Sequence, residues 1–221
     1  MILLSSLKCP ENIIILGQNS DMESYASKIE ERISHWKKGK IFFPLDFSDI
    51  AQPQTVRKTL TRLCDDKTIV RLGRGIFCIP KVDEKWGTGL ILPSLEEIAA
   101  AVAKCEMIRI APTGAYALNA LGLSTQVSTN IVYVTDGAPR KINIGNGRGI
   151  TFKHTSDVKL LSFKSELMSL IVASIKEMGE GCLTEKQISI IKEHLAKVEE
   201  EDFRHDVKLA PEWVRKQLFE L

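Results

Sequence analysis

Side chains that can hydrogen-bond to nucleic acid recur along one face of a helix predicted between Gln52 and Pro80. This stretch reads QPQTVRKTLTRLCDDKTIVRLGRGIFCIP, and we expect its helix from Pro53 to about Cys64. An apolar stripe at the i, i+4, i+7 spacing should face a core: Val56, Leu60 and Leu63. The opposite face carries long polar and cationic side chains: Gln54, Lys58 and Thr61, flanked by Arg57 and Arg62. Such a face is typical of a helix that contacts DNA, although an ordinary solvated face has the same composition.

A β-hairpin with arginines at and beside its tip is predicted directly after this helix. Residues 69–72 and 76–79 are rich in β-branched and aromatic types, and the turn between them reads Gly73-Arg74-Gly75. Arg71 lies on the first strand, close to Arg74 in the turn. Because a helix followed by a basic hairpin is the order of a winged helix-turn-helix, we expect the helix in a major groove and the two arginines on phosphates.

Two further helices are predicted ahead of the polar helix. From Met22 to Lys38, one helical face carries an apolar stripe: Tyr25, Ile29, Ile33 and Trp36. The segment LDFSDIA predicts a short helix capped by Asp46 or Ser48, with Phe47 and Ile50 turned inward. This short helix and the polar helix, joined at Ala51-Gln52, complete the predicted helix-turn-helix, so residues 22–80 are expected to form the DNA-binding domain.

Charge is distributed unevenly along the 221 residues, although the net charge is only +2. Residues 22–80 contain 11 Lys and Arg against 7 Asp and Glu, whereas residues 166–221 contain 8 against 12. A basic front and an acidic back suit a nucleic-acid-binding unit followed by a unit with another task. The 44% hydrophobic content is enough for globular cores.

The residue types of common catalytic and metal sites do not occur in recognisable patterns. Five cysteines are scattered without a C-x-x-C pair, which predicts reduced thiols in a cytoplasmic protein without zinc or disulfides. Four histidines lie in separate segments, outside any nucleophile motif: His35, His154, His194 and His205. We therefore expect no metal, no cofactor and no enzymatic activity. A nuclease would need a divalent-metal site that the sequence does not indicate.

The amino terminus is apolar but does not have the pattern of a signal peptide. It lacks a basic n-region and is interrupted by Lys8, Pro10 and Glu11. No run approaches the roughly 20 apolar residues of a membrane span. Residues 1–21 are interpreted as an extension, and Met22 is an alternative start of the folded protein.

The remaining chain predicts a linker, a small α+β domain and a helical region, which makes the whole protein α+β. Residues 81–93 are expected to be a linker in which Leu90 to Leu92 dock on a neighbour. Residues 94–165 should begin with a helix to about Lys104, which starts with a capping box of Ser94 and Glu97. A strand at 108–111, a helix at 113–121 and an antiparallel meander of strands at 131–135, 140–145 and 149–155 should follow. Residues 166–221 are expected to be helical, with one helix starting near Ser165 and another that begins with a capping box of Thr184 and Gln187.

One glycine-rich run in the middle domain, GNGRG from Gly145 to Gly149, could suggest a phosphate-binding loop. Because strands flank it and the G-K-[ST] ending is missing, we interpret it as a hairpin turn. Nearby cations could extend a basic surface or form a solvated edge: Lys141, Arg148 and Lys153.

Several segments together resemble the abortive-infection (AbiE) antitoxin family of type IV toxin–antitoxin systems. The polar helix and basic hairpin, TVRKTLTRLCDDKTIVRLGRGIFCIP, look like the amino-terminal domain of that family. APTGAYALNALGL, IVYVTDGAPRKINIG and GITFKHT look like the second domain of an uncharacterised branch of such antitoxins. The resemblance covers residues 22–165, is less specific in the helical tail and has no counterpart in residues 1–21.

This resemblance implies an antitoxin that also represses its own operon and counteracts a nucleotidyltransferase-type toxin. Its partners would be double-stranded operator DNA and a cognate toxin, with the oligomeric state left open. The DNA-binding positions carried over from the family are Gln54, Thr55, Arg57, Lys58, Thr61 and Arg62 on the helix, and Arg71 and Arg74 on the hairpin. Arg57 and Lys58 are the candidates for guanine edges, and Thr55 could instead be structural. The alternatives are a winged-helix protein-interaction module and a transcriptional regulator without a toxin partner.

Overall fold

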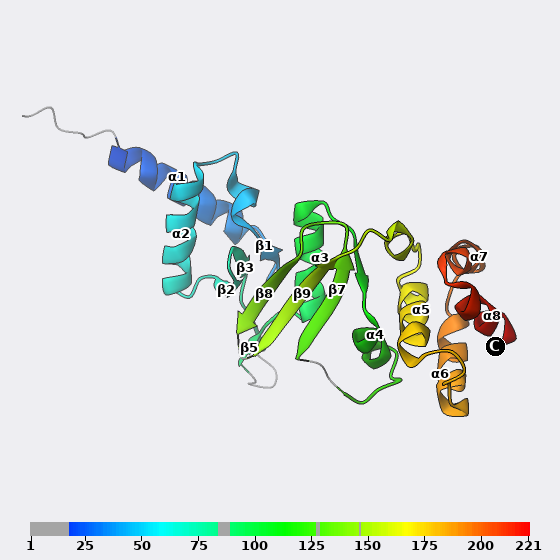
Figure 1. Ribbon diagram of the computed structural model, residues 1–221. Coiled ribbons are helices and arrows are strands. Elements are labelled where there is room, and N and C mark those ends of the chain that lie inside the picture. The colour runs from blue at the N-terminus through cyan, green and yellow to red at the C-terminus, as the bar shows by residue number, and fades with distance from the viewer. Residues whose placement is uncertain (1–17, 84–88, 127–128, 146) are drawn as a thin grey trace, which may run out of the picture.

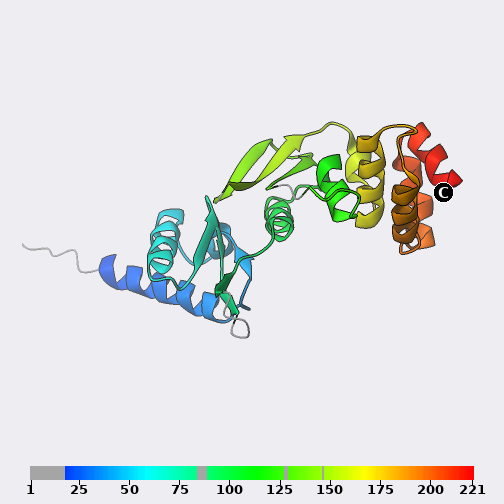
Figure 2. The ribbon, with the colours of Figure 1, turned by 90° about the horizontal axis from the view of Figure 1, so that it is seen from below.

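The helices and strands follow one another in a row, from α1 at one end of the molecule to α8 at the other (Figures 1 and 2). The structure is a computed structural model that describes residues 18–83, 89–126, 129–145 and 147–221. Its buried apolar residues form three clusters, one for each third of the row. The α+β class predicted from the sequence is confirmed.

The first third is built from helices packed on a small antiparallel sheet. Its elements are α1 (Gln18–Ser34), β1 (Ile41–Phe42), the 3-10 helix η1 (Pro44–Phe47), α2 (Pro53–Asp65), β2 (Val70–Gly73) and β3 (Ile76–Cys78). The strand order is β1-β3-β2. We call residues 18–78 the N-terminal unit. The stripe predicted on α2 is confirmed, because Val56, Leu60 and Leu63 are all buried against α1 and the sheet.

Helix α1 is shifted toward the amino terminus relative to its prediction. It begins at Gln18, ahead of Met22, and ends at Ser34 instead of Lys38. The Ser34 hydroxyl and the His35 ring both hydrogen-bond the Glu31 carbonyl oxygen, which competes with continuation of the helix. Trp36 therefore lies beyond the helix, where its ring packs 5.2 Å from that of Phe42.

The short helix before α2 is a 3-10 helix that begins at Pro44, ahead of both predicted caps, Asp46 and Ser48. Since Pro44 opens it, Asp46 lies in its first turn and accepts a hydrogen bond from the Phe43 N–H at 2.8 Å. Ser48 follows the helix instead of capping its start. Phe47 is fully buried and Ile50 partly buried, as predicted.

The predicted hairpin is confirmed, and each of its faces belongs to a different core. Strands β2 and β3 pair antiparallel, with Val70 opposite Cys78 and Arg71 opposite Phe77. Phe77 packs in the N-terminal unit, whereas Leu72, Ile76 and Cys78 pack in the next cluster along the chain. Because side chains alternate along a strand, one thin hairpin forms a wall between two cores.

Residues 81–93, expected to be a linker, contain a two-stranded antiparallel ribbon. Strand β4 (Lys81–Asp83) pairs with β5 (Gly89–Ile91), with Val82 opposite Leu90. The predicted docking of Leu90 to Leu92 is not observed within the described residues, since these side chains are 39–46% exposed. Pairing of the ribbon's two strands satisfies backbone groups without covering these side chains.

The middle third consists of a four-stranded sheet with α3 on one face (Figure 2). Its elements are α3 (Leu95–Glu106), β6 (Ile110–Pro112), α4 (Gly114–Ala120), β7 (Asn130–Thr135), β8 (Arg140–Gly145) and β9 (Arg148–His154). We call residues 94–154 the middle unit. The predicted capping box is confirmed: the Glu97 N–H donates to Ser94 Oγ, and the Ser94 N–H donates to the Glu97 carboxylate.

The predicted meander is wrong, because β9 is inserted between β7 and β8. The strand order is β6-β7-β9-β8, with β7 and β9 parallel and β8 antiparallel to β9. The link from β7 to β8 therefore crosses the end of β9 and is not a tight turn. At the start of this link, Asp136 accepts hydrogen bonds from the backbone N–H and the Nε of Arg109, the residue before β6. The hairpin predicted at Gly145–Gly149 is confirmed by the pairing of β8 with β9, with residue 146 outside the described residues.

The last third is a cluster of helices, as predicted. It contains η2 (Val158–Leu161), α5 (Glu166–Met178), α6 (Glu185–Leu195), α7 (Glu200–Asp206), η3 (Val207–Leu209) and α8 (Glu212–Glu220). Ser165 and Thr184 cap α5 and α6 as expected. The acidic run from Glu199 to Asp202 is the solvated start of α7, where carboxylates interact favourably with the helix dipole.

Candidate nucleic-acid interface

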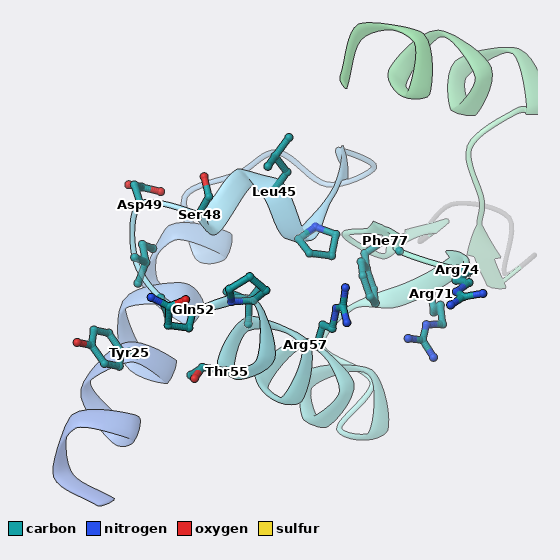
Figure 3. A pocket seen from close by; sticks show the side chains of 16 residues that line it. Tyr25, Leu45, Ser48, Asp49, Gln52, Thr55, Arg57, Arg71, Arg74 and Phe77 are labelled. Atoms are coloured by element: carbon teal, nitrogen blue, oxygen red, sulfur yellow. The ribbon is translucent and has the colours of Figure 1, made fainter. Parts of the chain in front are cut away.

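A groove of about 930 Å³ opens between η1, the first half of α2 and the β2–β3 hairpin (Figure 3). The three elements are fixed against one another because Phe47, Val56 and Phe77 share the same buried cluster. Apolar side chains form part of the wall and cations lie at the hairpin end, where Figure 3 shows Arg57 pointing toward Phe77, with Arg71 and Arg74 beside it. The groove therefore combines a helix, a hairpin tip and three guanidinium groups on one surface.

Four of the eight predicted DNA-binding residues line this groove. They are Thr55, Arg57, Arg71 and Arg74. Gln54 and Lys58 lie outside the groove. Both are exposed on the face of α2 opposite its buried stripe. The structure also adds Tyr25, Leu45, Asp49 and Gln52 to the lining, none of which was a predicted DNA-binding residue. Tyr25 was predicted in the apolar stripe of the first helix but is exposed, so that part of the stripe is wrong.

Thr61 and Arg62, which the sequence grouped with the other site residues, lie on another part of α2. Arg62 forms an ion pair with Glu30 of α1, and the Thr61 hydroxyl donates to the Arg57 carbonyl oxygen at 2.9 Å. Successive residues of a helix are rotated by about 100° around its axis. Arg62, five positions after Arg57, therefore lies on the side of α2 that faces α1. The structure therefore does not bring these two residues together with the groove arginines.

The carboxylate in the groove is already neutralised. Both Asp49 oxygens accept hydrogen bonds from the Arg32 guanidinium, each at 2.7 Å. The hydrogen bond from Arg32 lowers the pKa of the Asp49 carboxyl below its ordinary value, so this group stays ionised and paired. Within the described ranges, Arg57 and Arg74 have no ion-pair partner. The groove consequently presents an excess of positive charge to an incoming ligand.

The start of α2 adds a second attraction for anions. Gln52 occupies the N-cap position without a side-chain hydrogen bond, Pro53 is the first helical residue, and the first turn has no acidic residue. The positive end of the helix dipole is therefore uncompensated where α2 lines the groove. At the far end, the Arg71 guanidinium lies 5.5 Å from the centre of the Phe77 ring, which orients this side chain along the hairpin.

Metal or nucleophile chemistry would depend on the placement of His, Cys, Asp and Glu side chains among the residues that the structure describes. No group of three His, Cys, Asp or Glu side chains is placed to hold a metal ion there. Four cysteines are free thiols, while Cys9 lies outside the described residues. His194 bonds the Leu121 carbonyl oxygen and His205 bonds Asp206, so the histidines remain in separate places.

Within the same described ranges, no helix combines the length and the apolar character needed to span a bilayer.

Comparison with known proteins identifies a family for most of the chain. Residues 28–203 match DUF6088, described as a family of unknown function. The chain belongs to this family. The DUF6088 match includes α2, the hairpin, the middle sheet, α5 and α6. It therefore covers the middle unit and every groove residue except Tyr25. No curated protein and no solved structure matches the chain.

Proposed function

We propose that this DUF6088 protein binds duplex DNA through a winged helix-turn-helix and represses transcription of its own operon. The observation that supports this proposal most directly is the groove in which Arg57 of α2 and Arg71 and Arg74 of the hairpin lie together. One helix and one hairpin supply these cations, while Asp49, the carboxylate that lines the same groove, is paired with Arg32. A major groove accepts an α-helix, and a neighbouring hairpin then reaches the sugar-phosphate backbone.

Each cation has a distinct role in this arrangement. Arg57 is on the helix, where a guanidinium can donate two hydrogen bonds to a guanine edge, and exposed Lys58 and Gln54 extend the same helical face. Arg71 and Arg74 are on the hairpin and contact phosphates, which positions the helix without reading sequence. The open amino-terminal end of α2 favours a further phosphate.

The proposal includes an antitoxin role, which has a different kind of support. It derives from the resemblance of residues 22–165 to AbiE antitoxins, which implies a nucleotidyltransferase-type toxin as the partner. The acidic balance of residues 166–221 and their helical cluster provide a region separate from the basic groove. A protein that both represses and neutralises would use these regions for different partners.

The decisive experiment is a gel-shift titration of the full-length protein on DNA from upstream of its own gene. Scrambled DNA of equal length is the control, and both titrations are repeated across salt concentrations. We expect tight binding to the upstream DNA and weak binding to the scrambled DNA, with affinity falling steeply as salt rises. Equal weak binding to both, or none, would refute the repressor. Co-expression with the neighbouring gene then tests the antitoxin role by growth rescue.

A second candidate function is the binding of another protein, and one observation favours it. The β4–β5 ribbon and the residue after it expose four apolar side chains: Val82, Leu90, Ile91 and Leu92. Exposed apolar clusters of this kind occur at protein interfaces. A stable complex with the neighbouring gene product that persists in Arg57→Ala and is lost in Leu90→Ser would favour this function.

A further inference from the structure

A second groove, of about 640 Å³, lies on the other side of the hairpin tip. It is bounded by the tip, by η1 and the residue before it, by the end of α3, and by β8 of the middle unit. Pro44, Leu45, Arg74 and Gly75 line both this groove and the first one. The two grooves are therefore neighbours that meet along the hairpin tip, and Arg74 belongs to both.

The separation of the hairpin from β8 is fixed by close packing. A Cβ atom on Gly73 would lie 3.2 Å from the Asn143 carbonyl oxygen and 3.3 Å from Ile142 Cγ2. Leu72, Ile76 and Ile142 also belong to one buried cluster. Because β2 and β8 approach so closely, the second groove is a built feature of the fold, with its two walls at a set distance.

The charges in this groove resemble those in the first. Its carboxylate, Glu106, is paired with the Arg140 guanidinium at 2.5 Å, and Arg140 also lies 5.7 Å from the centre of the Phe152 ring. Arg140 is thus occupied by contacts within the protein. Lys141 is exposed and, among the described residues, has no partner, as is also true of Arg74. Lys141 and Arg74 are therefore available to bind an anion in a groove whose carboxylate is already paired.

We propose that the second groove binds the sugar-phosphate backbone of the same DNA duplex, with Lys141 and Arg74 on its phosphates. This inference rests on the proposed function and extends the DNA contact from the N-terminal unit to the middle unit. Two observations support DNA as the occupant: the groove is continuous with the first at Arg74, and its free charges are both positive. Lys141 would add affinity without adding base recognition, because phosphates carry no sequence information.

The test compares Lys141→Ala with Lys192→Ala, an equal charge change on an exposed face of α6, in salt-dependent gel shifts. We expect Lys141→Ala to weaken binding to upstream and scrambled DNA alike and to reduce the slope of log affinity against log salt by about one, the effect of one phosphate contact. Lys192→Ala should leave the slope unchanged, and Lys141→Arg should restore it. Matching thermal unfolding of all variants checks that the fold is intact.

The outcomes separate this inference from the repressor proposal. If the wild type fails to select its upstream DNA, both are refuted. If the wild type selects it but Lys141→Ala keeps the full salt slope, only the second contact is refuted. Loss of binding to the neighbouring gene product in Lys141→Ala, with the slope retained, would show that the groove binds protein instead.

Discussion

Arg57 and Arg74 face one groove from two elements, and their expected effects on binding differ. Removing Arg57 should cost about 1–3 kcal/mol of affinity for the operator and little for scrambled DNA, because a bidentate base contact is lost. Removing Arg74 should weaken binding to every sequence and lower the salt slope by about one. Gel shifts of Arg57→Ala and Arg74→Ala on both DNAs measure these effects.

Arg62→Ala is the matched control, since Arg62 is on the same helix but is paired with Glu30 outside the groove. It should bind both DNAs like the wild type. An operator-specific loss in Arg62→Ala as large as that in Arg57→Ala would contradict the assignment of the interface to the groove.

The Cys78 thiol should be unreactive in the folded protein. Burial, and to a lesser extent the neighbouring Cys64, raises the pKa of Cys78 from 9.0 to about 11, so the thiol is protonated at neutral pH. A thiolate-directed alkylating reagent should therefore modify exposed Cys182 in the native protein but leave Cys78 unmodified until denaturant is added. Mass spectrometry of peptides after timed labelling distinguishes the two sites.

The same raised pKa predicts how stability depends on pH. Below pH 9 the Cys78 thiol is protonated in both states, and its contribution to stability is complete. Between pH 9 and about 11 the unfolded chain loses this proton while the folded protein keeps it, so the free energy of unfolding falls. Cys78→Ala should unfold at lower denaturant concentration but should lose less stability across this pH interval. Equal losses in wild type and variant would contradict the assignment.

The sequence could predict the groove residues that follow a local period, but not those that depend on contacts between distant segments. Arg57 flanks the polar face that lies opposite a regular apolar stripe, so its exposure follows from helix geometry. Asp49 is neutralised by Arg32, 17 positions earlier in the chain, and no local pattern indicates that pair. Lys141 becomes a neighbour of Arg74 only through the packing of β2 on β8.

The hairpin offers a matched pair of glycine substitutions. Gly73→Ala would place a Cβ against the Asn143 carbonyl oxygen, and the resulting separation of the hairpin from β8 should cost about 1–3 kcal/mol. Gly75→Ala meets no atom within 4 Å, but its φ of +74° is unfavourable for alanine, at a cost of about 1 kcal/mol. Urea unfolding measures both losses.

DNA binding should distinguish the two variants further. If Gly73→Ala moves the hairpin relative to β8, it should weaken DNA binding through the second groove. Adding Lys141→Ala to the Gly73→Ala variant should then reduce affinity less than Lys141→Ala does in the wild type. Full additivity of the two changes would contradict this coupling.

Element bounds and caps were predictable wherever a few adjacent residues determine them. Ser94 with Glu97 and Thr184 with Gln187 form capping boxes from side chains three positions apart, and both were predicted. The order of the middle sheet was not, because the position of β9 depends on pairing with β7 across some 20 residues of chain. The predicted end of α1 was also wrong. The side chains of Ser34 and His35 hydrogen-bond the Glu31 carbonyl oxygen, which competes with continuation of the helix.

At the level of the whole molecule, the shared hairpin predicts that the N-terminal and middle units unfold together. Leu72 is 3% exposed and packs against the middle sheet, so Leu72→Ala should cost about 2–5 kcal/mol. Native-state hydrogen exchange should show loss of protection in both α2 and β9. The control is Val172→Ala in the C-terminal cluster, which should leave those amides unchanged. Loss of protection confined to β9 would contradict joint unfolding.

The two-faced hairpin also has a consequence for synthesis on the ribosome. Leu72, Ile76 and Cys78 are translated well before Ile150 and Phe152, the β9 residues in the cluster that buries them. A nascent chain that has completed α2 and the hairpin must therefore keep this apolar face in water until β9 emerges, and prematurely terminated products would retain it exposed. Such fragments would be substrates for chaperones and proteases.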